Sequence, residues 1–259
     1  MSDGVRVERE GASARVLLDR PERRNALALA GFAALAEAFQ QLGDDPALRC
    51  IVLTGAGDAA FSAGYDIAAF PKERSTTALA RANNPTIHAA FRAIEECPVP
   101  TLARIDGVCT GAGVVFAAAC DLRICSETSR FGFPIKRLGL TLGLNEMRLV
   151  QSLVGKATML EMLLEGRLHD SAWAVQRGLV HRAVASQALD EAVATSVQAI
   201  SEGAPLAARW HKGFIARLES TEPISQAEEE ESLACYDTDD FAEGYQAFLD
   251  KRAPQFRGR

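Results

Sequence analysis

Apolar residues in the first half of the chain alternate between short continuous runs and a helical spacing. Continuous runs bounded by Gly, Pro or Asp predict strands, at residues 15–19, 50–54, 101–105 and 122–125. Spacings of three and four residues predict intervening helices, with apolar faces formed by Phe32, Leu35, Phe39 and Leu42 and by Ile87, Phe91 and Ile94. Strands that alternate with helices are typical of parallel crossover units, so this half predicts an α/β fold.

The second half of the chain is predicted to be mostly helical. Two apolar stripes carry the helical spacing, one formed by Leu189, Val193, Val197 and Ile200 and the other by Leu206, Trp210, Phe214 and Leu218. The acidic run at residues 228–231 is typical of a solvated helix face. A shift in composition divides the chain into an α/β core, residues 1–185, and a helical C-terminal region, residues 186–259, which we expect to form one functional unit.

Composition narrows the class of protein. A chain of 259 residues can bury a sizeable core as one large domain or two small ones. Its net charge of −6 argues against a general nucleic-acid-binding surface. No apolar run approaches the roughly 18 residues of a membrane span, and residues 1–10 lack the apolar stretch of a signal peptide. We therefore expect a cytoplasmic protein with neither a nucleic-acid nor a membrane partner.

The cysteines and histidines do not form a recognisable metal-binding pattern. The six cysteines include no C-x-x-C pair, and most lie in apolar surroundings. The four histidines are scattered along the chain, whereas a metal site would need them clustered with cysteines or carboxylates. We expect reduced thiols in the core and no metal site.

Two glycine-containing segments, residues 61–67 and residues 106–113, are the candidates for chemistry. Each places small residues where backbone N–H groups can be approached closely. Ala112 and Gly113 lie at a predicted helix start, where free N–H groups and the helix dipole favour an anion. Two N–H groups that converge would stabilise a developing oxyanion, and losing one such donor typically costs about 2.7–4 kcal/mol. The sequence does not show whether N–H groups of the two segments converge on one point, because a glycine-rich turn after a strand can also be purely structural.

A competing motif overlaps the first of these regions. Residues 55–60, GAGDAA, follow a predicted strand and fit the G-x-G-x-x-A fingerprint of dinucleotide-binding folds. That fingerprint requires a helix to begin at the glycines, and residues 61–64 continue instead as a loop. The pattern therefore disfavours a nicotinamide-dependent oxidoreductase.

Taken together, several segments resemble the enoyl-CoA hydratase/isomerase (crotonase) superfamily. The resemblance lies in TGAGDAAFSAGYDI at residues 54–67, PTLARIDGVCTGAG at residues 100–113 and CDLRI at residues 120–124. RPERRNAL at residues 20–27 resembles the N-terminal motif of that family, and Gly244, Phe248, Lys251 and Arg252 resemble its C-terminal one. The similarity covers nearly the whole chain in order.

The resemblance implies a fold, a substrate and an assembly. The fold would be a spiral of ββα units with a helical C-terminal trimerisation region. The substrate would be an acyl-CoA thioester, with CoA as part of the substrate and no other cofactor. The assembly would be a homotrimer or a dimer of trimers.

The resemblance also implies roles for individual positions. The N–H groups of Tyr65 and Ala112 would be the two oxyanion donors. The adenine end of CoA would lie near four residues of the first half, and two C-terminal residues would reach the nucleotide, often from a neighbouring subunit. These six are Arg23, Ala63, Asp66, Ile67, Phe248 and Lys251. An exposed, solvated side chain is an equal interpretation of Lys251.

The sequence departs from the family at its acid–base positions. Hydratases of the family use two glutamates to position one water and move a proton, and such work needs titratable groups within hydrogen-bond reach. Those two positions are occupied here by Val115 and Ile135, which would line the substrate site but cannot transfer a proton. The oxyanion-binding pattern is retained, while the acid–base pair of the hydratases is missing.

Glu146 is the leading candidate to replace that pair. It lies at the start of a predicted helix, after a loop that lines the acyl pocket in relatives. The alternative is that Glu146 only caps the helix N-terminus, where acids are favoured. His88, on a predicted helix that covers the acyl end in relatives, is a weaker candidate, and the bulk of Tyr65 would narrow the pocket.

These observations favour an acyl-CoA enzyme, a lyase or isomerase, that stabilises an enolate-like oxyanion. Because both hydratase glutamates are replaced, double-bond isomerisation with Glu146 as the single acid/base is one hypothesis. Thioester hydrolysis and decarboxylation stay open, since superfamily members catalyse these with other side chains. The alternative from a different class is a non-catalytic acyl-CoA-binding protein.

Overall fold

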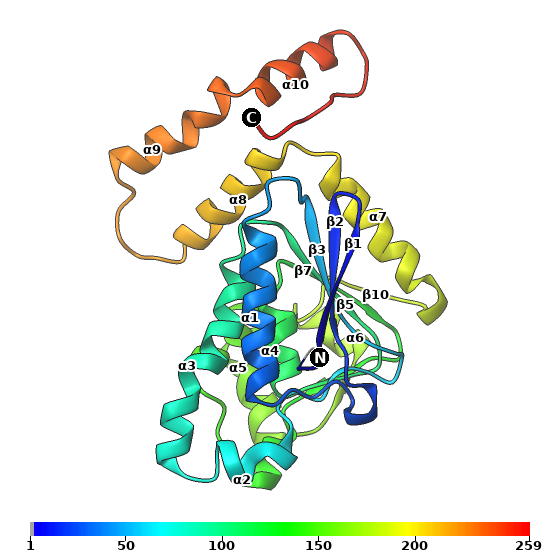
Figure 1. Ribbon diagram of the computed structural model, residues 1–259, viewed down its shortest axis with the longest axis vertical. Helices are drawn as coiled ribbons and strands as arrows, with labels where there is room; N and C mark the ends of the chain where they lie inside the picture. Colours follow the sequence, from blue (N-terminus) through cyan, green and yellow to red (C-terminus); the bar gives the residue numbers. More distant parts are fainter. Residues whose placement is uncertain (1–2) are drawn as a thin grey trace.

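The computed structural model describes residues 3–259 and is built around a six-stranded sheet. Its first two strands form an antiparallel hairpin, and all the other neighbouring pairs are parallel. The strand order is β1-β2-β3-β5-β7-β10 (Figure 1). The strands are β1 (Val5–Glu10), β2 (Ser13–Leu18), β3 (Cys50–Gly55), β5 (Thr101–Ile105), β7 (Leu122–Ser126) and β10 (Arg182–Val184).

A second sheet of four very short strands lies beside the first and was not predicted from the sequence. Its order is β4-β6-β8-β9, with β4, β6 and β8 parallel and β9 antiparallel to β8. The strands are β4 (Ala60–Ser62), β6 (Val108–Thr110), β8 (Arg130–Gly132) and β9 (His169–Asp170). Residues 56–59 of the GAGDAA segment form a bend and β4 begins at its last residue, Ala60. The helix that the dinucleotide fingerprint requires is therefore not formed there.

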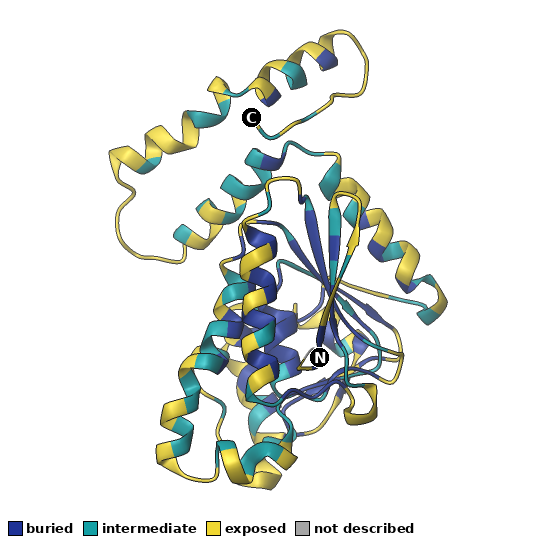
Figure 2. Ribbon diagram, viewed as in Figure 1, coloured by how far each residue is buried: buried dark blue, intermediate teal, exposed yellow. Residues whose placement is uncertain are grey.

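Helices cover the two sheets and complete the core. The pair α1 and α3 packs closely together, and α4 is buried between α3 and α5 (Figures 1 and 2). The helix α7 covers the other face of the six-stranded sheet and forms a separate apolar cluster with it through Leu189 and Val193. The helices of this part are α1 (Leu29–Gly43), α2 (Phe70–Glu73), α3 (Thr77–Glu95), α4 (Ala112–Ala119), α5 (Leu144–Glu165), α6 (Ser171–Gln176) and α7 (Leu189–Ser201).

Short 3-10 helices connect several of these elements. They are η1 (Pro21–Arg23), η2 (Ile67–Ala69), η3 (Pro134–Leu138), η4 (Ser186–Ala188) and η5 (Ala234–Asp237). The helix α5 is kinked at Gly155, whose φ of 74° lies in the left-handed region that glycine adopts without a steric penalty.

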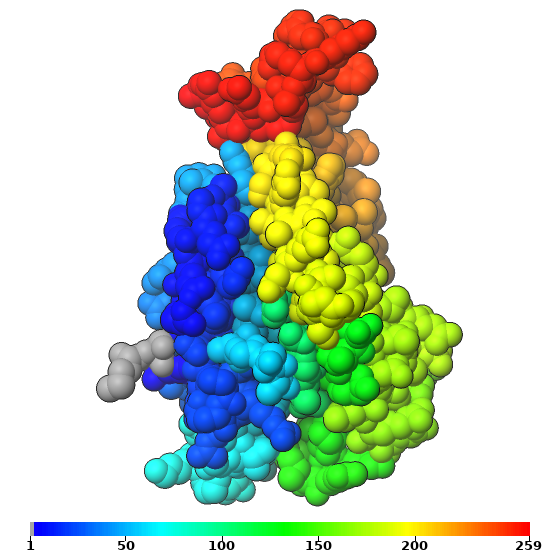
Figure 3. Space-filling view, turned by 90° about the vertical axis from the view of Figure 1, so that its right-hand side faces the viewer, coloured from blue at the N-terminus to red at the C-terminus, as the bar shows by residue number. Residues whose placement is uncertain are grey.

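The last three helices lie at one end of the molecule. They are α8 (Pro205–Arg217), α9 (Gln226–Leu233) and α10 (Asp239–Leu249). The helix α8 packs against the core, and α9 and α10 extend away from the sheets (Figure 1). Figure 1 shows α9 and α10 beyond the end of the core, Figure 2 shows them mostly exposed, and Figure 3 shows the same C-terminal segment stacked on the core in a side view. In the acidic run, Glu228 forms a capping box with Ser225 and an ion pair with Arg217, and Glu229–Glu231 are exposed as predicted.

The prediction of a mixed α/β fold is confirmed. The four predicted strands occur within two residues of their expected bounds, and the two predicted apolar faces lie on α1 and α3. The division at residue 185 stays a prediction.

Within residues 3–259 all six cysteines are unpaired and five are buried. No group of three or more His, Cys, Asp and Glu in this range is placed to hold a metal. None of the described helices is long and apolar enough to cross a membrane.

His169 gives the fold a dependence on pH. Its side chain is buried in β9, stacks on Trp173 at 3.7 Å between ring centroids, and has no hydrogen-bond partner for Nε2. Burial, followed by repulsion from Arg167, lowers the pKa of His169 below its ordinary 6.5. The unfolded chain therefore takes up a proton at a higher pH than the folded chain, and stability falls as the pH falls below about 6.5.

We expect His169→Phe, which keeps the stacking but cannot titrate, to make the unfolding free energy less dependent on pH. One proton contributes at most about 1.4 kcal/mol per pH unit, so the change in slope is bounded by that value. Urea denaturation of both proteins at a series of pH values from about 5 to about 8 measures it. His181, whose pKa is also lowered by burial and then by Arg123, leaves a remaining slope of the same sign. Equal slopes in both proteins would contradict the prediction.

Candidate active site

The candidate site lies at the carboxyl ends of three parallel strands of the small sheet. Residues 63–66 follow β4, residues 111–113 follow β6, and residues 133–135 follow β8. The carboxyl ends of neighbouring parallel strands lie at the same edge of a sheet, and in α/β folds ligands bind at such edges. The second sheet therefore brings together three segments that are far apart in the sequence.

Close packing at Gly64 places the two predicted oxyanion donors side by side. Gly64 has a φ of 89°, and a Cβ at this position would lie 2.6 Å from the backbone nitrogen of Ala112. A Cβ at Gly113 would lie 2.4 Å from the carbonyl oxygen of Ser62. Only residues without a side chain allow the two loops to approach this closely. The contact between the loops therefore requires glycine at positions 64 and 113.

The backbone around Tyr65 is held so that its own N–H is left free. Leu27 donates to the carbonyl oxygen of Gly64 over 2.9 Å and accepts from the N–H of Asp66 over 2.8 Å. These bonds hold the residues on both sides of Tyr65, whose N–H faces away from Leu27. Within residues 3–259, neither the N–H of Tyr65 nor that of Ala112, the first residue of α4, donates to any acceptor.

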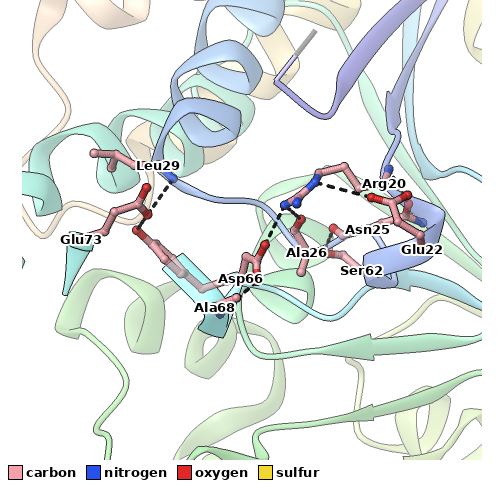
Figure 4. A network of polar contacts seen from close by, with 10 residues as sticks. Arg20, Glu22, Asn25, Ala26, Leu29, Ser62, Asp66, Ala68 and Glu73 are labelled. Carbon is pink, nitrogen blue, oxygen red and sulfur yellow. Dashed lines mark hydrogen bonds and ion pairs between the residues drawn. The ribbon is translucent and has the colours of Figure 1, made fainter. Parts of the chain in front are cut away.

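A polar network fixes the loop that carries Tyr65 (Figure 4). Asn25 is fully buried with a left-handed φ of 57°, and its Nδ2 donates to the carbonyl oxygen of Ala60 over 2.8 Å. Ser62 Oγ donates to the carbonyl oxygen of Asn25 over 2.8 Å and accepts from Gly64 N over 3.0 Å. Arg20 Nη1 donates to Asp66 over 3.0 Å. The RPERRNAL motif therefore supports the loop from behind.

A pocket is lined by both residues whose N–H groups are the predicted donors. Seven of the residues singled out from the sequence line it: Ala63, Tyr65, Ile67, Ala112, Val115, Ile135 and Glu146. Apolar side chains from α1, α3 and η3 form most of the remaining wall, with Phe32, Ile87, Phe91 and Leu138 among them. The site is thus a largely apolar cavity, with the two predicted donor residues in its wall.

Four residues implied by the resemblance do not line this pocket. Arg23 is exposed in η1, and Asp66 caps η2 by accepting from Ala68 N over 3.1 Å while it pairs with Arg20. Phe248 and Lys251 lie at the end of α10, at the opposite end of the molecule from α2 (Figure 1). A single chain therefore does not bring these two to the pocket, and their predicted role with CoA would require another copy.

Glu146 enters the pocket from the first turn of α5. Its side chain is only 13% exposed, and Oε2 is buried without a hydrogen-bond partner within residues 3–259. The carboxylate packs against Gly143, where a Cβ would lie 2.2 Å from Oε2. It lies in the position of a helix-capping acid, but no backbone N–H donates to its carboxylate in the described chain. The unpartnered carboxylate oxygen, buried against Gly143, gives no support to the capping interpretation.

His88 approaches Glu146 from α3. Its Nε2 lies 3.8 Å from Glu146 Oε1, and its Nδ1 lies 3.3 Å from Asn145 Nδ2. An amide nitrogen can only donate, so this contact makes Nδ1 the acceptor and places the ring proton of a neutral histidine on Nε2, facing the carboxylate. The structure thus brings His88 beside the candidate acid/base.

Comparison with known proteins identifies the family. A family model described as enoyl-CoA hydratase/isomerase matches residues 8–259. The chain belongs to the enoyl-CoA hydratase/isomerase family. An enoyl-CoA hydratase/carnithine racemase from Magnetospirillum magneticum superposes with a TM-score of 0.98 at 40% identity, covering 99% of this chain and 96% of that one.

Other members of the enoyl-CoA hydratase/isomerase family match over a similar length. An enoyl-CoA hydratase from Mycobacterium smegmatis superposes with a TM-score of 0.90 at 31% identity, covering 98% of each chain. A carnitinyl-CoA dehydratase from Salmonella typhi is 30% identical over 266 residues, covering 100% of both sequences. The fold is therefore that of the crotonase superfamily, and the chain is an acyl-CoA enzyme of this family.

Val115 and Ile135, the two positions where the resemblance led us to expect the hydratase glutamates, belong to the apolar wall of the pocket. Val115 is fully buried in α4, and Ile135 is half-buried in η3. Both line the cavity, and neither can donate or accept a proton. Any proton transfer in this pocket would therefore have to come from another side chain.

Sequence reasoning missed a second polar group behind Tyr65. Glu73 Oε2 accepts from Tyr65 Oη over 2.5 Å and from Leu29 N over 3.1 Å. Burial, and then this hydrogen bond, raises the pKa of Tyr65 well above its ordinary value, so the phenol stays protonated. Arg74 lies over the ring, 5.6 Å from its centroid. No spacing in the sequence indicated these contacts, because they depend on how α2 folds back toward α1.

We expect Gly64→Ala to destabilise the fold and damage the site together. An alanine at position 64 would have to keep the positive φ of Gly64. Its Cβ would lie 2.6 Å from Ala112 N. Strained backbone of this kind costs roughly 1–3 kcal/mol, before any clash is counted. Thermal unfolding should show the loss of stability, and acyl-CoA binding should weaken in protein that is still folded. Gly139→Ala, also at positive φ but with no atom within 4 Å of the added Cβ, is the control for strain alone.

Proposed function

We propose that this enzyme holds an acyl-CoA thioester oxygen between the N–H groups of Tyr65 and Ala112 and isomerises the acyl double bond. One observation carries the proposal. Among the residues that line the pocket, Glu146 is the one carboxylic acid, and the same pocket holds both N–H donors. A single carboxylate opposite an oxyanion-binding pair is sufficient to move a proton from one carbon to another.

The proposed reaction moves one proton and consumes no water. Glu146 accepts a proton from C2 of a 3-enoyl-CoA, and the electron pair spreads over the chain to the thioester oxygen. The N–H groups of Tyr65 and Ala112, with the N-terminus of α4, stabilise the negative charge on that oxygen. Glu146 then returns the proton to C4, which leaves the double bond between C2 and C3. His88 contributes by orienting the carboxylate from 3.8 Å.

Apolar walls argue against efficient hydration. Addition of water across the double bond needs a group that orients the water and a group that supplies a proton. The side chains of Val115 and Ile135 can do neither, and an apolar wall offers a water few hydrogen-bond partners. The comparison supports the family, while the choice of isomerisation within the family follows from these two residues together with Glu146.

Product analysis tests the proposal. The wild-type enzyme is incubated with a 3-enoyl-CoA and, separately, with a 2-enoyl-CoA of the same length, and all products are separated. We expect the 3-enoyl-CoA to become the 2-enoyl-CoA, with little 3-hydroxyacyl-CoA from either substrate. Release of free CoA would assign thioester hydrolysis instead, and loss of CO2 from a malonyl-type thioester would assign decarboxylation. Tight binding without turnover of any acyl-CoA would support the non-catalytic binder.

We further propose that copies of the chain assemble through the helical C-terminal region, as trimers or pairs of trimers. Exposed apolar side chains on α9, η5 and α10 support this, with Tyr236, Tyr245, Phe248 and Leu249 each more than half exposed. In such an assembly Phe248 and Lys251 reach the CoA site of a neighbouring copy, near Arg23 and Ile67. The molecular mass in solution, measured by light scattering, tests the assembly, and a stable monomer would refute it.

A further inference from the structure

One cation lines the apolar pocket without an acidic partner. Arg74 follows α2 and is half-buried, and Nη1 donates to Asn84 on α3 over 3.0 Å. Arg74 forms no ion pair with any carboxylate in residues 3–259, and its other N–H groups have no protein acceptor in that range. A guanidinium has five N–H donors in a planar fork, so most of them are available to a ligand.

The neighbouring acid does not neutralise Arg74 by direct contact. Glu73 turns to the other side, where Oε2 accepts from Tyr65 and from the N–H of Leu29. Glu73 does not line the pocket. The charged side chains on the pocket wall are therefore Arg74 from the α2 side and Glu146 from α5.

Arg74 lies against the aromatic side chains of the pocket. It packs over Tyr65, whose ring stacks on Phe32 and meets the edge of Phe70, each at 5.3 Å between centroids. Phe32 in turn contacts Phe91 on α3. These aromatic side chains line the same pocket as Arg74, whereas Arg23, one of the proposed CoA contacts, is exposed and does not line it.

Arg74 is half-buried, so water can reach the N–H groups that have no protein acceptor, and a ligand that fills the pocket displaces that water. Desolvating a charge is unfavourable, whereas a carboxylate that accepts two parallel N–H bonds from arginine forms one of the stronger charge-assisted contacts in proteins. A cationic acyl group would be repelled by Arg74, which already occupies the face of Tyr65 that a cation would use. A purely apolar acyl group would leave the guanidinium without a partner.

We propose that Arg74 recognises a carboxylate at the far end of the acyl chain, so that the substrates of this enzyme are acyl-CoAs with an anionic acyl group. The inference rests on the proposed function, because it takes the thioester to lie at Tyr65 and Ala112. It assigns Arg74 as a specificity-determining residue, and Asn84 and Tyr65 hold its side chain in place. Glu146 remains the one acid that faces the reacting carbons.

The test uses saturated thioesters, which have no double bond to isomerise or hydrate and therefore report binding alone. The probes are butanoyl-CoA, 4-carboxybutanoyl-CoA, 5-carboxypentanoyl-CoA and 4-(trimethylammonio)butanoyl-CoA, each titrated into the full-length enzyme by calorimetry. The CoA portion is common to all four, so differences in Kd report the acyl end. Two carboxylate lengths are included because the arginine side chain can reach more than one position.

The variants are Arg74→Gln, which removes the charge, Arg74→Lys, which keeps a point charge, and Lys72→Gln. Lys72 is an exposed cation on α2 that does not line the pocket, so it controls for the loss of one positive charge nearby. Charge-assisted bonds contribute about 1.5–3 kcal/mol, which corresponds to a factor of roughly 10–100 in Kd. We expect one carboxylated probe to bind wild type and Lys72→Gln at least about tenfold more tightly than butanoyl-CoA.

In Arg74→Gln that preference should fall to about twofold or less, and Arg74→Lys should retain part of it. Equal binding of all four probes, or a preference that survives Arg74→Gln, would overturn the inference and leave the proposed function intact. Tighter binding of the trimethylammonio probe would also overturn it and assign a cation subsite facing Glu146. Failure of every acyl-CoA to bind would refute the proposed function and the inference together.

Discussion

Glu146→Gln is expected to lower the rate of double-bond isomerisation by a factor of about 10²–10⁴, the usual contribution of a positioned general acid/base. Glutamine has nearly the same shape but cannot accept a proton from carbon. Glu146 is the one carboxylic acid on the pocket wall, and its Oε2 has no partner in residues 3–259, so we expect no other side chain to take over. Turnover of a 3-enoyl-CoA, measured beside the affinity for a saturated acyl-CoA, separates chemistry from binding.

The matched control is Glu165→Gln, at the far end of α5. Glu165 is exposed, pairs with Arg167 and does not line the pocket, so its loss should leave turnover near that of the wild type. Affinity for the saturated acyl-CoA should be unchanged within a few-fold in both variants. A Glu146→Gln enzyme that isomerises at the wild-type rate would remove Glu146 from the mechanism and return it to the role of a helix-terminal acid.

Ala112→Pro is expected to lower turnover by about 10²–10³ by removing one of the two oxyanion donors. Ala112 is the first residue of α4, where proline is tolerated because its missing N–H has no acceptor within the helix. Gly111 precedes it and has no Cβ to clash with the proline ring. The substitution therefore removes an N–H group and leaves the hydrogen bonds of the helix intact.

Ala112→Gly controls for the side chain at this position. It keeps the N–H and removes only a methyl group, so we expect turnover within a few-fold of wild type. Circular dichroism and thermal unfolding show whether the proline variant keeps the fold. A folded Ala112→Pro enzyme with unchanged turnover would mean that the N–H of Ala112 does not stabilise the transition state.

The sequence predicted the large sheet and its helices because their signals are long and periodic. The strands β5 and β7 contain five residues each, and the apolar faces of α1 and α3 repeat over several positions. The strands of the small sheet contain two or three residues each, which is too short to show a period. These strands nevertheless bring the site together, so its geometry was accessible only through the resemblance to a family.

The same limit explains which site residues were found. Tyr65, Ala112 and Glu146 follow glycine-containing motifs that are recognisable along the chain, and the structure places all three around one pocket. Arg74 and Glu73 belong to a short helical segment without a motif, and their positions depend on contacts with Asn84 and Leu29. Side chains that select a substrate through long-range contacts of this kind leave no local pattern.

Loss of deuterium from C2 of a 2,2-dideuterated 3-enoyl-CoA tests the central claim most directly. The claim is that the carboxylate of Glu146 removes a proton from C2 of the substrate. The N–H groups of Tyr65 and Ala112 stabilise the enolate-like intermediate that results. We expect wild type to remove deuterium from C2 as the 2-enoyl-CoA appears, and Ala112→Pro and Glu146→Gln each to slow the loss at least about 100-fold. A wild-type enzyme that binds the thioester but leaves C2 fully deuterated, or variants that remove deuterium at the wild-type rate, would contradict the account.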